Sequence, residues 1–266
     1  MKTKKIKLAY FSPTGTSERV ARGVADGIEA AELETIDITR PETREKPVRC
    51  AADELLLVAV PVYMGRVPAL LHGWLNALEA RETPAVCIVV YGNRAYEDSL
   101  LELKDTLANR GCIPVAGGAY IGEHSFSDEQ APVAMGRPNE EDLRHAHAFG
   151  KAIREKLDSV ASPADLADLQ VPGEHPYGGR TQLWDVDFIA VDDRCAQCGL
   201  CAKVCPVGAV DPANSAAIDI AKCITCCACI KKCPQNARSK KASPVMEASQ
   251  RLFNLFTEPK KPEYFL

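Results

Sequence analysis

Eight of the twelve cysteines in this chain stand in two copies of one pattern, CxxCxxCxxxCP. The members of the two copies, each followed by proline (Pro206 or Pro234), are Cys195, Cys198, Cys201 and Cys205, then Cys223, Cys226, Cys229 and Cys233. Every cysteine of the first copy recurs 28 residues later, so the two runs form an internal repeat. A fold that contains this segment must bring eight thiols to defined places.

Thiolates at this spacing are the ligands of [4Fe–4S] clusters in bacterial ferredoxins, where the fourth cysteine of each run binds the cluster of the other run. We therefore predict two clusters with exchanged fourth ligands. The first is bound by Cys195, Cys198, Cys201 and Cys233, and the second by Cys223, Cys226, Cys229 and Cys205.

Two other uses of the cysteines compete with this interpretation. Zinc also selects soft thiolates, but structural zinc sites usually combine two CxxC pairs across a longer insert, whereas each run here has four cysteines. A disulfide framework is disfavoured by the length of the chain and by the lack of an export signal. Two zinc knuckles on a binding module stay the non-redox alternative, and such a protein would be colourless.

Four cysteines are left over. Cys227 takes the place that Gly199 has in the first copy, and we interpret it as a thiol that is not a ligand. Cys50, Cys87 and Cys112 are expected to be small core residues.

The length of 266 residues predicts one or two domains, and 46 % apolar residues suffice for an ordinary core. The formal charge of −4 gives no reason to expect nucleic acid, and no apolar run reaches membrane-spanning length. The basic start, Met-Lys-Thr-Lys-Lys, is followed by only a short apolar stretch, which we interpret as a first strand. We expect a cytoplasmic protein, because that reducing compartment suits oxygen-sensitive clusters.

Apolar strands and amphipathic helices alternate through the first part of the chain. Strands are predicted at 5–11, 32–38, 54–60, 84–91 and 112–121, and helices after the first strand, at 67–79, after Asp98 and at 139–157. This alternation predicts an α/β fold, a doubly wound five-stranded parallel sheet of the flavodoxin-like order 2-1-3-4-5. A small α+β bacterial ferredoxin-like domain follows it.

We predict four segments. Residues 1–157 form the flavodoxin-like domain, 158–186 a connector, 187–240 the ferredoxin-like domain and 241–266 a tail. The tail contains apolar residues that could line one side of a helix docked on the protein, although a partner-binding helix is the alternative. These residues are Val245, Met246, Leu252, Phe253 and Phe256.

Ligands of doubly wound sheets bind at the carboxyl ends of the strands, where the strand order reverses. The loop after the first predicted strand, 12–17, offers hydroxyls, a glycine and a helix N-terminus to a phosphate. The loops 61–68 and 91–97, after the third and fourth strands, can bond the pyrimidine edge of an isoalloxazine while a tyrosine stacks on its face. The FMN-binding candidates are Ser12, Thr14, Gly15, Thr16, Ser17, Pro61, Val62, Tyr63, Met64, Gly65, Arg66, Tyr91, Gly92, Asn93, Arg94 and Tyr96.

The segment Thr14-Gly15-Thr16 is similar to the FMN-phosphate loop of flavodoxins. Together with the loops 61–66 and 91–94 and the C-terminal cysteine runs, nearly the whole chain resembles the flavodoxin–ferredoxin fusion proteins, sometimes called ferrodoxins. The segments 122–127 and 136–139 and the ending 262–266 also resemble that family. The resemblance implies one FMN, held by the three loops, but little about a substrate.

Some residues near the expected flavin invite specific hypotheses. Arg66 and Arg94 would raise the flavin potential if they face the ring, whereas ordinary pairing with a loop carbonyl or carboxylate is the alternative. Tyr63, Tyr96 and His124 are candidates to contact the flavin or a substrate, and no catalytic residue is assigned.

The combination predicts an electron-transfer protein that relays electrons between two [4Fe–4S] clusters and FMN, with a redox protein as donor or acceptor. The alternative is an FMN-dependent reductase of a small molecule such as a quinone, fed through the clusters. A pocket lined by Tyr63, Tyr96, His124 and Phe126 would favour the reductase, and a flavin site covered by the ferredoxin-like domain or the tail would count against it. No GxGxxG motif predicts a separate NAD(P)H site.

Overall fold

The computed structural model describes residues 5–182 and 184–266. Residues 1–4, which include most of the basic start, and residue 183 of the predicted connector lie outside the described part.

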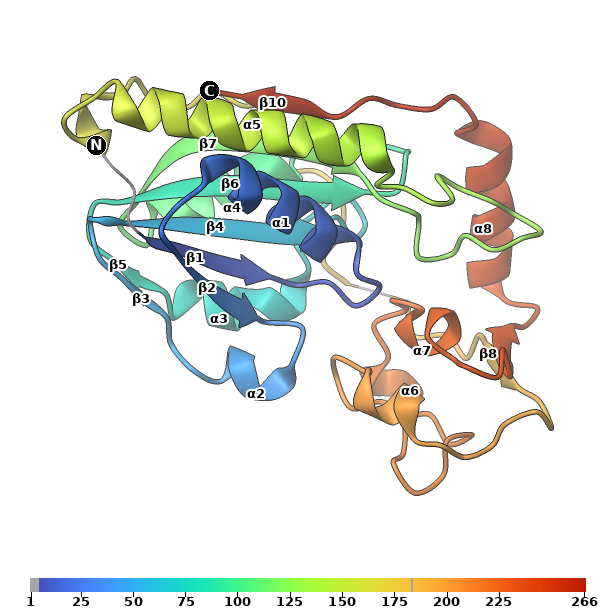
Figure 1. Cartoon of the computed structure of the whole chain (residues 1–266). Helices are drawn as coiled ribbons and strands as arrows, with labels where there is room; N and C mark the ends of the chain where they lie inside the picture. The colour runs from blue at the N-terminus through green and yellow to red at the C-terminus, as the bar shows by residue number, and fades with distance from the viewer. Residues whose placement is uncertain (1–4, 183) are drawn as a thin grey trace.

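The centre of the molecule is a six-stranded sheet in the order β10-β7-β6-β4-β1-β2. Its five parallel strands are β1 (Lys5–Tyr10), β2 (Glu32–Asp37), β4 (Glu54–Pro61), β6 (Thr83–Tyr91) and β7 (Cys112–Ile121). Numbered along the chain, these five have the predicted order 2-1-3-4-5, which is that of the flavodoxin-like fold. Their carboxyl ends all point toward one side of the molecule (Figure 1).

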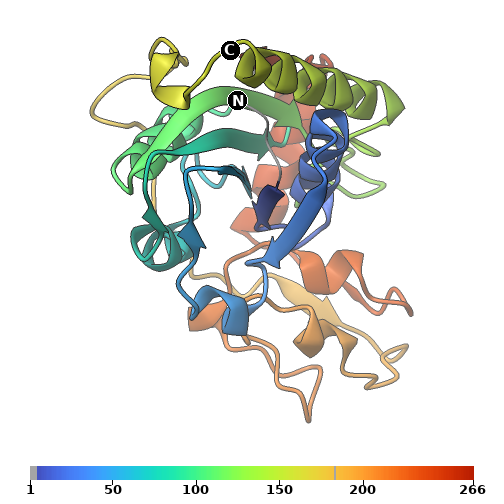
Figure 2. The ribbon, with the colours of Figure 1, turned by 60° about the vertical axis from the view of Figure 1, so that its left-hand side comes forward.

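Helices cover both faces of this sheet (Figure 2). On one face α1 (Thr16–Ile28) and α5 (Glu140–Asp158) pack against each other and bury one apolar cluster. On the other face lie α3 (His72–Asn76) and α4 (Ser99–Ala108) over a second cluster. The central strands β4 and β6 are therefore buried on both sides, which explains their nearly unbroken apolar sequences.

The predicted helix at 67–79 is shorter than expected. A 3₁₀ turn (Ala69–Leu71) precedes α3, which ends at Asn76. The chain must then become extended, because β5 (Glu79–Ala80) pairs in parallel with β3 (Arg49–Cys50) in a small second sheet. The sequence pattern contains no signal for this two-residue pairing.

A compact lobe carries the cysteine runs and lies beyond the carboxyl ends of the parallel strands (Figure 1). It is framed by the antiparallel strands β8 (Ile189–Val191) and β9 (Arg238–Lys240). Two single-turn helices, α6 (Leu200–Lys203) and α7 (Ala228–Lys231), each contain the third cysteine of one run. Short turns complete the chain: α2 (Pro41–Arg44) and 3₁₀ turns at Pro163–Asp165 and Ile220–Lys222. From α2, Arg44 donates to the carbonyl of Pro206, so the sheet domain touches the lobe there too.

The connector between the two domains packs along the molecule. Tyr177 donates to Asp105 of α4 at 2.7 Å, and the N–H of Arg180 donates to the carbonyl of Met64 at 3.0 Å. Near its end Trp184 stacks on Phe126, with ring centroids 6.1 Å apart. The connector therefore has defined contacts in spite of its irregular sequence.

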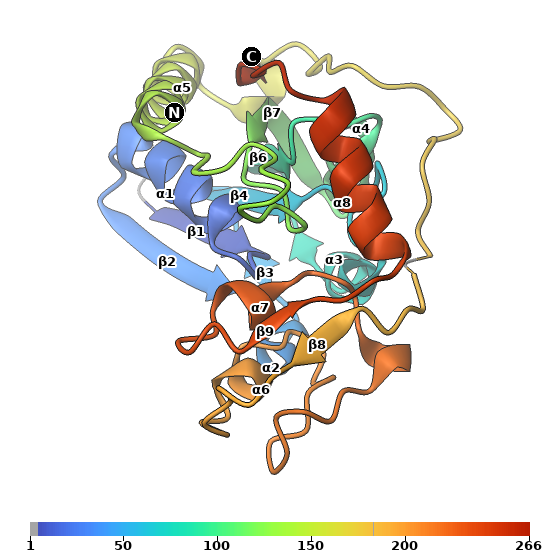
Figure 3. The same ribbon diagram turned by 90° about the vertical axis from the view of Figure 1, so that its right-hand side faces the viewer.

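The tail returns from the lobe to the sheet (Figure 3). It forms α8 (Pro244–Leu255) and then β10 (Glu263–Phe265), which pairs antiparallel with β7. Tyr264 of β10 stacks on Phe149 of α5 at 4.8 Å. The sheet thus has six strands rather than the five predicted, because the tail covers the edge of β7 that would otherwise expose unpaired backbone groups.

The buried residues of α8 are Val245, Ala248 and Ser249, with Leu252 partly covered. Met246, which we expected on the same side, is 36 % exposed. The helix is docked on its own chain, but its inner face includes small and polar residues that an apolar pattern does not reveal.

Asn93 fastens this tail with three hydrogen bonds. Its amide donates to the carbonyls of Phe256 (2.8 Å) and Glu258 (3.0 Å), and its oxygen accepts from the N–H of Lys260 (3.1 Å). Asn93 has a positive φ of 61°, a conformation that glycine also adopts without strain.

We predict that Asn93→Gly keeps the fold but loosens the tail, because the backbone conformation survives while three hydrogen bonds of about 1 kcal/mol each are lost. Hydrogen–deuterium exchange should be at least tenfold faster in residues 257–266 and unchanged in α4. Gln250→Ala on the exposed face of α8 is the control. Equal protection of the tail in Asn93→Gly and in the parent would contradict this role.

Candidate functional site

A hollow of about 710 Å³ lies at the carboxyl ends of β1, β4, β6 and β7. It brings together the three predicted loops and adds a fourth, which follows β7. Its walls also include two residues of the cysteine-rich lobe. The lining residues are Ser12, Pro13, Thr14, Thr16, Ser17, Pro61, Val62, Tyr63, Met64, Val90, Tyr91, Gly92, Gly122, Glu123, His124, Ser125, Phe126, Ile224 and Thr225.

The loop after β1 is built to receive an anion. Gly15 has a φ of 93° and begins α1, whose N-terminus has no side-chain cap. The hydroxyl of Ser12 accepts the N–H of Glu18 at 3.0 Å, while the hydroxyl of Ser17 is fully buried and has no partner among the described residues. A phosphate would satisfy Ser17 and the free helix N–H groups, so the residues fit the phosphate of FMN.

In the loop after β4 only the first half faces the hollow. Tyr63 and Arg66 exchange two backbone hydrogen bonds of 3.0 Å and close a tight turn, which leaves Tyr63 and Met64 in the wall. Gly65 lies outside the lining. Arg66 is held by Glu102 through two bonds of 2.8 and 2.9 Å and lies 5.2 Å from the ring of Tyr177.

The loop after β6 is divided in the same way. Tyr91 and Gly92 line the hollow, while Asn93 binds the tail and Tyr96 packs on Tyr91 at 5.4 Å. Arg94 pairs with Glu97 at 2.6 Å. Neither Arg94 nor Arg66 lines the hollow, and each pairs with a carboxylate, as the alternative to a role at the flavin expected.

His124, in the fourth loop, is held in one tautomer. Its Nδ1 accepts the N–H of Phe126 at 3.0 Å, so Nε2 carries the proton. A Cβ at Gly92 would lie 2.2 Å from the His124 ring, so only glycine lets the ring lie so close to that backbone. Burial, together with the charges of Lys231 and Lys240, lowers the pKa of His124 to about 4. The ring is therefore a neutral donor at the edge of the hollow.

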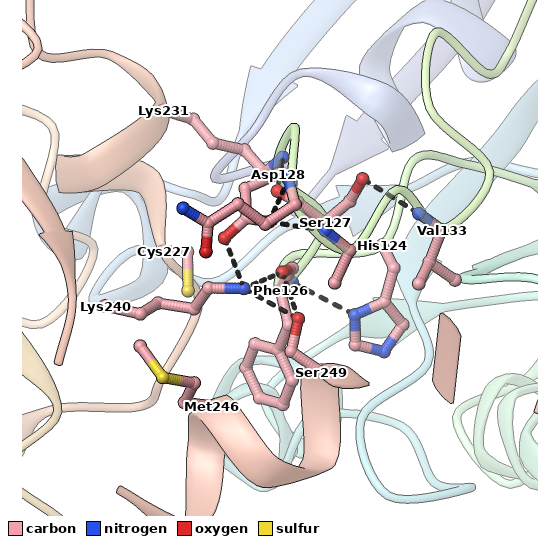
Figure 4. Close-up of polar contacts among 12 residues, drawn as sticks. His124, Phe126, Ser127, Asp128, Val133, Cys227, Lys231, Lys240, Met246 and Ser249 are labelled. Carbon is pink, nitrogen blue, oxygen red and sulfur yellow. Dashed lines mark hydrogen bonds and ion pairs between the residues drawn. The ribbon is translucent and has the colours of Figure 1, made fainter. Parts of the chain in front are cut away.

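Two lysines of the lobe bind this fourth loop through hydrogen bonds and ion pairs (Figure 4). Lys231 of α7 bonds the Glu123 carboxylate at 2.5 Å and the Ser127 carbonyl at 3.1 Å. Lys240 of β9 bonds the Asp128 carboxylate at 2.8 Å, the Phe126 carbonyl, and the hydroxyl of Ser249 in α8 at 2.6 Å. The Lys240 side chain is only 6 % exposed, and these partners compensate for the loss of water around its charge.

The eight cysteines surround two smaller hollows in the lobe. One, of about 310 Å³, is lined by Cys195, Cys198, Cys201 and Cys233. The other, of about 350 Å³, is lined by Cys205, Cys223, Cys226 and Cys229, with Cys227 beside them. The structure therefore groups the thiols in the two exchanged sets expected from the sequence. Within residues 5–182 and 184–266, no three His, Cys, Asp or Glu side chains converge closely enough to hold a single metal ion.

The two runs share one backbone conformation. Positive φ angles recur at Gln197 and Thr225 (50° and 54°), and at Gly199 and Cys227 (71° and 58°). Cys227 therefore occupies a glycine position, and its thiol donates to the carbonyl of Thr225 at 3.6 Å. The interpretation of Cys227 as a thiol that is not a ligand therefore stays a prediction, and its place at the glycine position of the first copy favours it.

The sequence did not predict that the lobe contributes to the hollow at the carboxyl ends of the strands, which we call the flavin hollow. Ile224 and Thr225, between the first two cysteines of the second run, line that hollow, and Ile224 also lines the hollow of Cys223 and Cys226. One difference between the two copies could have indicated this contribution: Ile224 stands where the first run has the smaller Ala196.

We predict that Cys227→Gly retains the full iron content, because glycine adopts the positive φ without strain and no ligand is lost. It should also be more stable than Cys227→Ala by about 1 kcal/mol, since alanine keeps the left-handed strain. Iron analysis and denaturant unfolding measure both effects, with Cys223→Ala as the ligand-loss reference. Loss of iron in Cys227→Gly would make Cys227 a ligand.

His124 should make the protein acid-sensitive. Its native pKa lies below the unfolded value, so the unfolded state binds the extra proton between about pH 6.5 and 4, and stability falls as the pH falls through this window. We expect wild type to lose about 1–2 kcal/mol more than His124→Asn between pH 7 and 5. Thermal unfolding of both proteins across this range measures the difference, and parallel curves would contradict the neutral imidazole.

Comparisons with known proteins find one family model for the C-terminal lobe. Residues 188–241 match the family model described as "4Fe-4S dicluster domain". No curated protein matches the chain. Within the described residues, no helix is long and apolar enough to cross a membrane.

Among solved structures, the chain is similar to a flavodoxin from the domain Archaea, with 14 % identity over 58 % of this chain and 99 % of that one, at a TM-score of 0.39. It is also similar to a flavodoxin of Streptococcus pneumonia TIGR4 (16 % identity, 57 % and 99 % coverage, TM-score 0.39). An NADH:FMN oxidoreductase, EMOB, is 16 % identical over 60 % of this chain and 92 % of its own, with a TM-score of 0.43. The chain thus combines a sheet with the strand order of the flavodoxin-like fold and a C-terminal segment that matches a 4Fe-4S dicluster domain, an arrangement consistent with the flavodoxin–ferredoxin fusion proteins.

Proposed function

We propose that this protein transfers electrons between an FMN at the carboxyl ends of the sheet and two [4Fe–4S] clusters in the lobe. When bound, the clusters exchange single electrons and FMN takes up one or two. The observation that carries the proposal is the shared wall: Ile224 lines both the flavin hollow and the hollow of the second cysteine set. Ile224 is therefore common to the walls of both sites.

The residues around the flavin hollow have distinct tasks in this proposal. The uncapped N-terminus of α1 and the buried Ser17 hydroxyl bind the phosphate. Tyr63 offers an aromatic face, and His124 offers a fixed Nε2–H donor. Thr225 and Ile224 exclude water on the side of the lobe.

The two cysteine sets differ in their access to solvent. Cys226 and Cys229 of the set beside the flavin hollow are buried, whereas Cys198 of the other set is exposed. We therefore place the partner's docking site at the Cys198 side. The order of sites is then the redox partner, the Cys198 set, the Cys223 set and FMN.

A small-molecule reductase is less well supported. Tyr96, one of the four residues expected over an open pocket, lies outside the lining, and Ile224 and Thr225 of the lobe form part of the wall. The flavin hollow is thus covered in part by the domain that we expect to exchange electrons with it.

The order of sites predicts the behaviour of Cys198→Ser. This variant should lose the cluster of its own set, about four of about eight irons, and keep its FMN. A reduced plant-type [2Fe–2S] ferredoxin should then reduce the FMN at least tenfold more slowly in stopped-flow absorbance, because its entry point is gone. Dithionite, which can approach the flavin directly, should reduce it at the parental rate.

Cys227→Gly is the matched control, because it removes a thiol of the same lobe that is not a ligand. It should transfer electrons at the wild-type rate. If the ferredoxin reduces the FMN of Cys198→Ser as fast as that of wild type, electrons do not enter through this set, and the proposed order is wrong.

A further inference from the structure

The two copies of the cysteine repeat differ at one buried position. Val210 in the first copy and Arg238 in the second stand 28 residues apart, and each is 4 % exposed. An aliphatic side chain is the ordinary occupant of such a site. An arginine there keeps its charge, because its guanidinium does not deprotonate in proteins, and burial of that charge costs several kcal/mol unless it is compensated.

The protein compensates only part of this cost. One nitrogen of Arg238, Nη1, donates to the carbonyl of Ser215 at 2.6 Å. Nε and Nη2 are buried and have no hydrogen-bond partner among the described residues, and Arg238 makes no ion pair with the carboxylates that are described. Three N–H groups on these two nitrogens thus await an acceptor, which is costly unless something else fills the space.

The position of Arg238 indicates what that acceptor is. The side chain forms part of the wall of the hollow lined by Cys195, Cys198, Cys201 and Cys233. It also lies beside the Cys229 thiol of the neighbouring set, with which it interacts through its charge and a side-chain hydrogen bond. Arg238 therefore stands between the two cysteine sets and lines the hollow of the Cys198 set.

We propose that Arg238 donates N–H bonds to sulfur of the cluster held by the Cys198 set and thereby raises the reduction potential of that cluster. Reduction adds one negative charge, and a fixed buried cation with N–H donors stabilises the reduced form more than the oxidised form. The valine of the first copy leaves the other cluster without an equivalent donor. The inference rests on the clusters of the proposed function but not on electron transfer to FMN.

A purely structural role is the competing explanation. Arg238 donates to the carbonyl of Ser215, and the N–H of Ser215 donates to the side chain of Gln197 at 2.8 Å, so Arg238 could simply brace the loop between Cys195 and Cys198. A brace would change cluster assembly or stability. It would leave the midpoint potential of the assembled cluster where it was.

Redox titration monitored by EPR separates these roles in the whole protein. Arg238→Gln removes the charge and keeps an amide donor, and Arg238→Lys keeps the charge but loses the planar donor set. We expect the equilibrium constant for reduction of one cluster to fall at least tenfold in Arg238→Gln, about 59 mV for one electron. In Arg238→Lys we expect a fall of about threefold. Lys203→Gln is the control, because it removes one positive charge from an exposed site of the same lobe.

The inference would be overturned if neither cluster of Arg238→Gln changed its midpoint potential by more than the clusters of the control Lys203→Gln do. If Arg238→Gln does not assemble its clusters, Arg238→Lys becomes the test variant. Midpoint potentials in Arg238→Lys equal to those of the control would then contradict the inference. Neither result depends on the flavin. Fully loaded clusters with unchanged midpoint potentials would refute only the inference about Arg238. Missing clusters in the wild-type protein would refute the proposed function.

Discussion

Burial of two lysine ammonium groups against one loop determines how the halves of this molecule meet. Lys231 and Lys240 belong to the lobe, and their partners are carboxylates and carbonyls of the loop after β7, together with Ser249 of α8. Lys240 is the more deeply buried of the two, and its charge is compensated by three partners, so the loop and the lobe are expected to keep a fixed relation. That relation brings Ile224 and Thr225 to the flavin hollow and holds His124 neutral beside it.

The internal repeat has one backbone and two different environments. Both copies turn through positive φ angles at corresponding residues and begin a single helical turn there. Their side chains then diverge: Ile224 in place of Ala196 reaches the flavin hollow, and Arg238 in place of Val210 enters the wall of the other cysteine set. The symmetric segment can thus hold two similar clusters in dissimilar surroundings, which a relay with a preferred direction requires.

The parallel sheet and the exchanged cysteine sets could be predicted because their signals are local or periodic. Unbroken apolar runs identify β4 and β6, and the fixed spacing of the thiols groups them. Residues that act through distant partners could not be predicted. Arg66 was expected at the flavin but binds Glu102, and Asn93 was expected at FMN but binds a tail more than 160 residues later. Strand β10 is three residues long and is defined by its pairing with β7, so it is too short to show a periodic apolar pattern in the sequence.

The central claim is that three cofactor sites lie in series, with Ile224 between the flavin and the nearer cysteine set. A crystal structure of anaerobically purified protein, with anomalous scattering recorded at the iron edge, tests it most directly. We expect two four-iron peaks, one within each cysteine set, with Cys205 bound to the cluster of Cys223, and one flavin whose phosphate lies at Ser17. Single-metal peaks at the cysteines, or a flavin outside the hollow that Ile224 and Thr225 help to form, would contradict it.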